Sequence, residues 1–261
     1  YYQTTSSWYG GCNYMIYEVH RRTRGNIGDF FCNPSRYFDF RPITKKLTDQ
    51  INIKDSTIVI GGGGLIHPSF TPRIVELLEQ QPKNIIVWAI GSNYALDKDK
   101  GYPDWIRNAT LVGIRDFKSL SVNSTLGEYV PCVSCMHPAF NKKYKASYDK
   151  VYYLHARQSS EDTFKKLEGK PLLTNKAKDF NEVITFLGSG ETVVTDSYHG
   201  AYWAMLMKRN VQVVPWSTKF KTFKYIPVLL ESILEDSNDT MYIDPKYRDD
   251  CRKINKRFYD K

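Results

Sequence analysis

The sequence predicts an α/β protein whose parallel sheets are divided between two lobes. Its 261 residues lie near the size at which one hydrophobic core usually splits into two. Short apolar runs recur along the chain and end repeatedly in turns that contain glycine, arginine, aspartate or serine. Residues 193–215 read as strand, turn, helix and strand, which is the building unit of a parallel sheet.

Composition and charge limit the class of protein and its partners. Apolar residues make up 41% of the chain, and no stretch approaches the roughly 20 apolar residues of a membrane span. We therefore expect a soluble protein without a transmembrane segment. The net charge of +9 favours an acidic partner, such as a phosphate-bearing donor, an anionic glycan, nucleic acid or, through a peripheral contact, an anionic lipid surface. Nucleic acid is not expected, because the basic residues are scattered and form no known binding motif.

Cysteine usage predicts a reducing compartment, and hence a cytoplasmic location. Five cysteines are too few and too dispersed for a disulfide scaffold. The segment 132–137, CVSCMH, has no second cysteine or histidine pair that would complete four zinc ligands. The segment 97–99 has the D-x-D spacing of a metal motif but lies in a lysine- and aspartate-rich loop without a preceding strand. We predict no metal and no cofactor other than a donor substrate.

The first turn of interest lies at residues 25–28, where two glycines precede an apolar, aromatic segment. This pattern indicates a loop that leads into a helix. Asp29 at its start is either the N-cap of that helix or a carboxylate that faces a substrate. The local pattern favours the cap.

A run of four glycines follows the buried strand predicted at residues 56–60. Such a run, Gly61 to Gly64, allows a ligand to approach the backbone closely. It is not a Walker A loop, because no Gly-Lys-Ser/Thr ends it. It also fails the G-x-G-x-x-G pattern, because Ile66 takes the place of the third glycine. His67 either faces the same cleft or the solvent.

Further strands are predicted at residues 84–90 and 110–114, after a helix capped by Thr71 with Pro72 in its first turn. The second of these strands ends at Arg115-Asp116. Because the carboxyl ends of parallel strands meet at one edge, where open α/β sheets bind ligands, we expect polar groups to gather there. Arg115 is then either a clamp for phosphate or carboxylate or a partner in a local ion pair, and its position favours the clamp.

The second lobe is predicted to begin after the proline-bounded segment 131–138, with the boundary between residues 145 and 146. A strand at residues 151–157 carries His155 at its end, and Asp179 begins a helix that ends at Gly188. Lys219 lies in the polar and aromatic loop that follows the final strand. Residues 247–258 have the spacing of an amphipathic C-terminal helix.

The turn at residues 196–200 is the strongest candidate for a ligand site. It joins the strand at 193–195 to a helix over 201–207, and it places Ser197 and His199 at a helix N-terminus, where an anion is favoured. The alternative is that Ser197 is only an N-cap and His199 a surface turn residue.

Five motifs in order resemble the polysaccharide pyruvyl transferase family. They are NIGD (26–29), GGGGL after a strand (61–65), W-x-I-G (88–91), GIRD-x-x-S (113–119) and SYHG-x-x-x-A (197–204). The resemblance covers residues 26–215. It implies two Rossmann-like lobes facing across a cleft, as in GT-B glycosyltransferases. It also implies phosphoenolpyruvate as donor, held by the C-terminal lobe (146–261), and a sugar of a cell-surface or capsular polysaccharide as acceptor, on the N-terminal lobe (1–145).

The resemblance assigns roles to individual residues. Arg115 matches the arginine of the family's R-D-x-x-S element, and His199 matches the histidine after the last strand of the second lobe. In characterised pyruvyl transfer enzymes the latter element reads Arg-Leu-His, and its arginine helps to hold the donor. Here it reads Ser197-Tyr198-His199, so a metal-independent glycosyltransferase that uses a nucleotide sugar stays an alternative. A non-catalytic glycan or nucleic-acid binder is a third, which leaves the polar turns at the strand ends unexplained.

These inferences define the predicted site. With phosphoenolpyruvate as donor, His199 is either the acid or a hydrogen-bond donor to the phosphate, and Arg115 is a clamp. With a nucleotide sugar as donor, Asp29 is the candidate base. The catalytic candidates are therefore His199, Asp29 and Arg115. The donor-binding candidates are Arg115, His155, Ser197, Tyr198, His199, Gly200 and Lys219, and the cleft loop comprises Gly61, Gly62, Gly63, Gly64 and His67.

Overall fold

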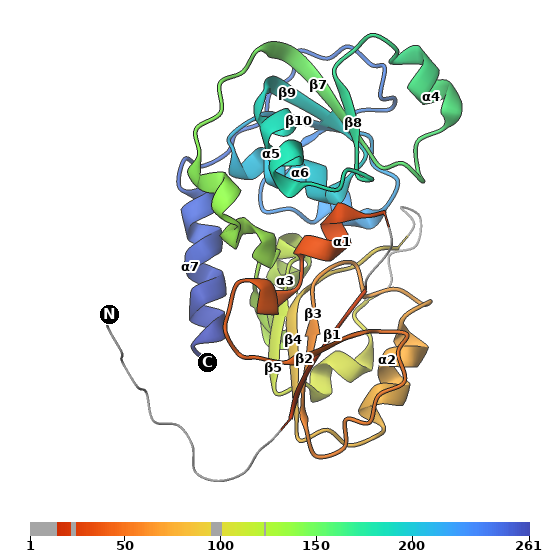
Figure 1. Ribbon diagram of the computed structural model, residues 1–261, viewed down its shortest axis with the longest axis vertical. Helices are drawn as coiled ribbons and strands as arrows, with labels where there is room; N and C mark the ends of the chain where they lie inside the picture. The colour runs from red at the N-terminus through yellow and green to blue at the C-terminus, as the bar shows by residue number, and fades with distance from the viewer. Residues whose placement is uncertain (1–14, 22–24, 95–100, 123) are drawn as a thin grey trace.

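The chain forms two all-parallel sheets, one above the other along the long axis of the molecule (Figure 1). The computed structural model describes residues 15–21, 25–94, 101–122 and 124–261. Cys12 and the D-x-D segment 97–99 lie outside the described residues. The predicted α/β class is confirmed, with two sheets of six and five strands that are consistent with two Rossmann-like lobes.

The six-stranded sheet has the order β2-β1-β3-β4-β5-β6, and the five-stranded sheet has the order β11-β10-β9-β7-β8. The strands of the first are β1 Ile16–His20, β2 Ile43–Lys46, β3 Thr57–Gly61, β4 Asn84–Ile90, β5 Leu111–Ile114 and β6 Glu128–Tyr129. Those of the second are β7 Tyr148–Leu154, β8 Leu172–Thr174, β9 Gly190–Thr195, β10 Asn210–Val213 and β11 Val228–Leu229.

Both sheets share one topology, which predicts where a ligand site is favoured. β1 lies between β2 and β3, and β7 lies between β8 and β9, so each sheet grows first to one side and then to the other. The carboxyl ends of the strands on either side of such a switch point border a crevice. Arg21 and the glycine run follow β1 and β3, whereas His155 and Asp196 follow β7 and β9.

Of the seven α-helices among the described residues, all but those over 117–122 and 161–166 were predicted from the sequence. The seven are α1 Ile27–Phe31, α2 Thr71–Leu78, α3 Phe117–Val122, α4 Glu161–Lys166, α5 Phe180–Gly188, α6 Tyr198–Leu206 and α7 Tyr247–Tyr259. Asp179 caps α5, as predicted, by accepting from the Asn181 amide at 2.9 Å. The N-cap of α2 is Phe70 rather than Thr71, which is already helical. α6 begins three residues before the predicted 201, because Ser197 is its N-cap.

Strand β1 was not predicted, because the charged residue at its centre interrupts the apolar run. Glu18 sits in the middle of the strand with none of its surface exposed. Its carboxylate accepts from the Ser35 amide at 3.0 Å, from the Ser35 hydroxyl and from Asn33 Nδ2 at 3.4 Å. A buried carboxylate needs such partners, and they come from a segment that the strand itself does not reveal.

The chain crosses between the two sheets at both of its ends. α1 lies between the sheets (Figure 1), and the Ile27 amide donates to the Asn175 carbonyl of the second sheet at 3.0 Å. α7 returns to the first sheet, where Asn255 Oδ1 accepts from Trp88 Nε1 at 3.0 Å and the Phe258 ring meets Trp88 edge-on. The predicted C-terminal helix is confirmed, whereas the lobe boundary at residue 145 stays a prediction.

Among the described residues, no helix has both the length and the apolar character that crossing a bilayer requires.

Candidate functional site

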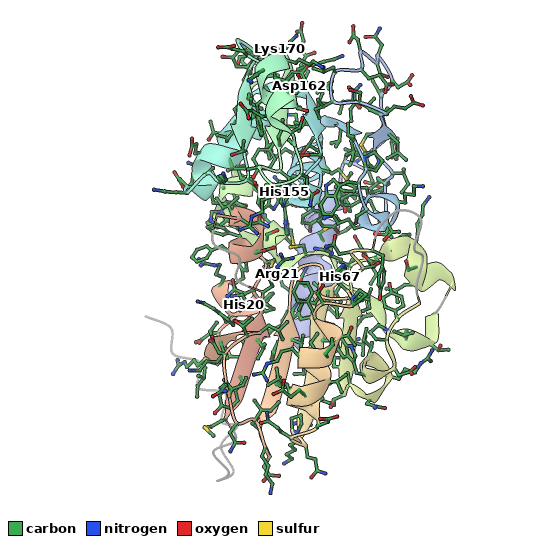
Figure 2. The ribbon with its side chains drawn as sticks, turned by 90° about the vertical axis from the view of Figure 1, so that its right-hand side faces the viewer. His20, Arg21, His67, His155, Asp162 and Lys170 are labelled. Carbon is green, nitrogen blue, oxygen red and sulfur yellow. The ribbon has the colours of Figure 1, made fainter. Side chains whose placement is uncertain are left out.

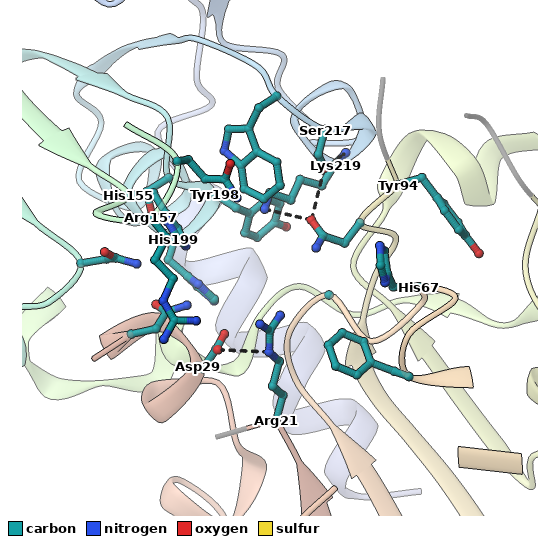
Figure 3. Close-up of a pocket in the computed structure, with 18 of the residues that line it drawn as sticks. Arg21, Asp29, His67, Tyr94, His155, Arg157, Tyr198, His199, Ser217 and Lys219 are labelled. Carbon is teal, nitrogen blue, oxygen red and sulfur yellow. Dashed lines mark hydrogen bonds and ion pairs between the residues drawn. The ribbon is translucent and has the colours of Figure 1, made fainter. Parts of the chain in front are cut away.

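A cavity of about 600 Å³ lies between the carboxyl edges of the two sheets. Arg21, His67 and His155 gather at this level, far from Asp162 and Lys170 at the outer end of the second sheet (Figure 2). Its first wall comes from residues after β1, β3, β4 and β5, together with α1. Its second wall comes from residues after β7, β9 and β10 (Figure 3). The shared topology thus brings both switch points to one space.

Arg115 is a buried charge without a hydrogen-bonding partner for two of its nitrogens. It follows β5, only 3% of its surface is exposed, and its guanidinium carbon lies 3.9 Å from the centre of the Tyr198 ring. Its Nε and Nη1 have no hydrogen-bond partner among the described residues. Burying an ionised group in this way costs free energy unless an anion completes the arrangement. Arg115 lines the cavity, so that anion can be a ligand.

The neighbouring carboxylate of Asp116 does not supply the missing partner. Asp116 is fully buried and accepts from the Ser92 amide at 2.6 Å and from the Thr222 hydroxyl at 3.2 Å. Burial raises the pKa of Asp116, while Arg115 and these hydrogen bonds act in the opposite direction. Asp116 therefore fixes the loops after β4 and β10 and leaves Nε and Nη1 of Arg115 without a hydrogen-bond partner in the described part of the chain.

His199 lies in the first turn of α6 with 8% of its surface exposed. Its ring is tilted against Trp203, and its Nε2 lies 3.6 Å from the Cys132 sulfur. Burial lowers the pKa of His199 well below its usual range, and Arg115 and Lys219 add to this effect. The imidazole is therefore neutral at pH 7, so it offers one donor and one acceptor nitrogen.

Ser197, Tyr198 and Gly200 surround His199 in different ways. The Ser197 hydroxyl accepts from the Gly200 amide at 3.3 Å, so Ser197 is an N-cap that also lines the cavity. Tyr198 lines the cavity under Arg115 and stacks on Phe223 with ring centres 4.5 Å apart. Gly200 is not among the lining residues. Its place requires glycine because a Cβ atom would collide with the Tyr153 ring.

Lys219 is held at the meeting point of the two walls. Its Nζ donates to Asn93 Oδ1 at 3.0 Å and lies 3.6 Å from the centre of the Trp216 ring. Asn93 Oδ1 also accepts from the Ser217 hydroxyl at 3.2 Å. Burial lowers the pKa of Lys219 well below its usual range, with Arg115 adding to the effect. The loops after β4 and β10 are therefore joined by polar contacts at the rim of the cavity.

Asp29 is not the N-cap of its helix, which corrects the preferred prediction. Asn26 is the cap, because its side chain accepts from the Gly28 amide at 3.2 Å. Asp29 lies one turn further on and lines the cavity, with Oδ2 3.8 Å from Arg21 Nε. In Figure 3 these two residues lie on the side of the first sheet, facing His155, Arg157 and His199.

His155 and His67 are both among the lining residues. Burial lowers the pKa of His155 to about 4, with Lys219 contributing, and its Nδ1 accepts from the Arg157 amide at 3.3 Å. Asp196 holds this turn by accepting from the His155 amide at 2.6 Å. His67 faces the cavity rather than solvent alone, and its Nδ1 accepts from the Ser69 amide at 3.2 Å.

The glycine run contributes less of the cavity than predicted. Of its four residues only Gly64 is a lining residue. A Cβ at Gly61 would lie 2.7 Å from Pro34 Cδ, and Gly62, with φ +65°, lies against the Cys32 backbone. The run therefore makes room mainly for the chain segment that follows α1.

Basic side chains dominate the cavity. Among the described residues, Arg21, Arg115, Arg157 and Lys219 line it together with a single carboxylate, Asp29. Arg21 was not predicted as a site residue, although it follows β1 as Arg115 follows β5. Further lining residues that were not predicted are Asn93, Tyr94, Asn175, Trp216 and Ser217. The same rule, a polar residue directly after a strand, applies to Arg21 only once β1 is known.

The described residues contain no group of three or more His, Cys, Asp or Glu side chains arranged to hold a metal ion. Cys132 contacts His199, whereas Cys135 contacts Asn255 Nδ2 at 3.6 Å.

Two parallel sheets that border one basic cavity define a two-lobed α/β protein whose candidate site lies between the sheets. The model of the polysaccharide pyruvyl transferase family matches residues 16–218, and the chain belongs to this family. Membership implies a transferase with a polysaccharide acceptor. A solved structure of a functionally uncharacterised protein from Klebsiella pneumoniae is similar in fold, with a TM-score of 0.51 and 16% identity over 77% of this chain and 83% of that one. No protein with a curated description matches the chain.

Proposed function

We propose that the protein transfers a pyruvyl group from phosphoenolpyruvate to a sugar of a cell-surface or capsular polysaccharide, forming a ketal. One observation carries the proposal, namely that the buried guanidinium of Arg115, two of whose nitrogens have no hydrogen-bond partner among the described residues, belongs to the lining of a cavity rich in basic side chains. Phosphoenolpyruvate bears a phosphate and a carboxylate, and arginine binds both groups through paired hydrogen bonds. Family membership supports the same donor.

The reaction sets out what the site has to do. Two sugar oxygens bond to C2 of the donor, the bond from C2 to the phosphate oxygen breaks, and inorganic phosphate leaves. One of the two hydroxyl protons goes to the CH₂ carbon, which becomes a methyl group, and the other goes to the phosphate. The site must therefore accept protons from the acceptor and stabilise the departing phosphate.

The residues divide between these tasks. Arg115 clamps the donor, and His199, which is neutral at pH 7, donates a hydrogen bond to its phosphate rather than acting as an imidazolium acid. Asp29 takes the proton of the acceptor hydroxyl, because it is the residue with a carboxylate among the described residues that line the cavity. His155, Ser197, Tyr198 and Lys219 complete the donor side. A cytoplasmic location and the assignment of donor and acceptor to separate lobes stay predictions.

Ligand-dependent melting tests the donor directly. We expect phosphoenolpyruvate to raise the melting temperature in a saturable way, because a ligand at 100 times its Kd stabilises the fold by about 2.7 kcal/mol. Arg115→Met should abolish this shift, whereas Arg107→Met, which removes an exposed arginine outside the cavity, should preserve it. Phosphate release that depends on both donor and acceptor, followed by ³¹P NMR, completes the test. Stabilisation by a nucleoside diphosphate or a nucleotide sugar, with no response to phosphoenolpyruvate, would overturn the proposal.

A further inference from the structure

A chain of hydrogen bonds runs through the protein interior and ends at His199. Trp203 Nε1 lies 2.9 Å from the Ser134 hydroxyl oxygen. That oxygen lies 3.2 Å from the Cys132 sulfur, which lies 3.6 Å from His199 Nε2. Trp203, Ser134 and Cys132 have no exposed surface. Water therefore does not compete for these groups, and each polar hydrogen requires a partner within the chain.

The chemistry of the donors fixes the direction of this chain. An indole N–H can only donate, so the Ser134 oxygen accepts from Trp203. The hydroxyl hydrogen of Ser134 then needs an acceptor of its own. Among the described residues its hydrogen-bonding neighbour on that side is the Cys132 sulfur, which therefore accepts it.

The thiol hydrogen of Cys132 is then directed to the remaining neighbour of the sulfur, His199 Nε2. A neutral imidazole whose Nε2 accepts a hydrogen bond carries its proton on Nδ1. His199 Nδ1 lies on the ring edge next to Gly28 of α1, and α1 also contributes Asp29 to the cavity. On the interior side of the ring, Nε2 thus accepts a hydrogen bond, and on the side toward α1, Nδ1 carries the hydrogen that can be donated.

We propose that Cys132 and Ser134 are positioning residues that hold neutral His199 in the Nδ1–H tautomer, so that it can donate a hydrogen bond to a ligand oxygen in the cavity. The opposite tautomer would turn a nitrogen lone pair toward an anion and repel it. The tautomer follows from the contacts alone, whereas its effect on turnover rests on the proposed pyruvyl transfer.

Cys135 provides a matched comparison. It is as fully buried as Cys132 and lies one turn further along the same short helix, Val133–Met136, but it contacts Asn255 instead of His199. Replacing either cysteine by alanine removes the same atoms from the interior. A packing role predicts similar effects for both variants, whereas a positioning role predicts an effect on His199 from Cys132 alone.

Nitrogen NMR reads the tautomer without any assay of activity. The chain has five histidines, so selective ¹⁵N-histidine labelling with His199→Gln for assignment gives a tractable spectrum. We expect a neutral His199 between pH 6 and 8, with unprotonated Nε2 far downfield of protonated Nδ1. Cys132→Ala should populate the second tautomer, and Cys135→Ala should not. A proton on Nε2 of the native protein would overturn the proposal.

Kinetics test the functional part. We expect Cys132→Ala to lower kcat/KM on the order of 10- to 100-fold, the range found when a group that orients a metal-ligating histidine is lost. Cys132→Ser retains a donor and should recover part of both the tautomer and the rate, which also covers the case in which the alanine variant does not fold. A Cys132→Ala protein with the altered tautomer and an unchanged rate would refute the positioning role. If neither the native protein nor any variant uses phosphoenolpyruvate, the proposed function is refuted, whereas the tautomer measured by NMR is unaffected.

Discussion

Adding one methyl group at Gly28 should disable the site through His199. A Cβ at Gly28 would lie 2.8 Å from His199 Cγ and 3.0 Å from Cε1, and closer still to Nδ1. Ordinary contact begins near 3.4 Å, so the shortfall at Cγ alone is 3.4 − 2.8 = 0.6 Å. The ring cannot retreat freely, because it is buried against Trp203.

The expected consequence of Gly28→Ala is a displacement of His199 by about 1 Å, which can lower a rate on the order of 100-fold. Overpacking costs about 1–3 kcal/mol, and the higher helix propensity of alanine offsets about 1 kcal/mol of that. Urea unfolding and phosphate release measure the two effects. Gly101→Ala is the control, because a Cβ there meets nothing within 4 Å. Wild-type activity in Gly28→Ala would show that the position of His199 is either unconstrained by α1 or irrelevant to transfer.

Two further outcomes concern pH and the C-terminal helix. His155 has a pKa lowered to about 4 in the fold, against about 6.5 when unfolded. Between these two pH values the unfolded state therefore binds more protons than the folded state. The free energy of unfolding should fall as the pH drops from 6.5 to 4, and it should fall less steeply in His155→Gln than in the native protein. Asn255→Leu should lower the free energy of unfolding, measured in urea, by roughly 2–6 kcal/mol. It leaves the Trp88 indole N–H and the Pro131 carbonyl without hydrogen-bond partners, at a cost of about 1–3 kcal/mol each. Lys253→Leu on the exposed face of α7 should change the unfolding free energy little, and equal losses in both variants would refute this reasoning.

The sequence was most informative where apolar runs end in polar turns. The runs at β3, β4, β5 and β9 are rich in valine and isoleucine, and their periodicity identifies buried parallel strands without help from the rest of the chain. The rule that their carboxyl ends share an edge selected Arg115, and the helix N-terminus after β9 selected His199; the fold brings both residues to one cavity.

Other parts of the site depend on contacts between distant segments. β1 was missed because Glu18 is compatible with a buried strand only when Asn33 and Ser35 satisfy its carboxylate. Without β1, Arg21 had no strand end to mark it. Asn93 joins the cavity through Lys219, 126 residues away, and no local pattern encodes such a pairing. The cap of α1 was misplaced because Asn26 and Asp29 are both good capping residues, and only the geometry of the turn chooses between them.

The exchange of α1 and α7 between the two sheets has a consequence for how the cavity meets its ligands. Each sheet is fastened to the other by a segment from the opposite end of the chain, and the contacts of Asn93 with Ser217 and Lys219 add a third connection. Three separate connections of this kind restrict movement of the two sheets relative to each other. We therefore expect the basic side chains to keep their spacing before a ligand binds, so that binding loses little entropy in ordering them. On this view a substitution in α7 should change ligand affinity from outside the cavity, because it alters how the two sheets are held together.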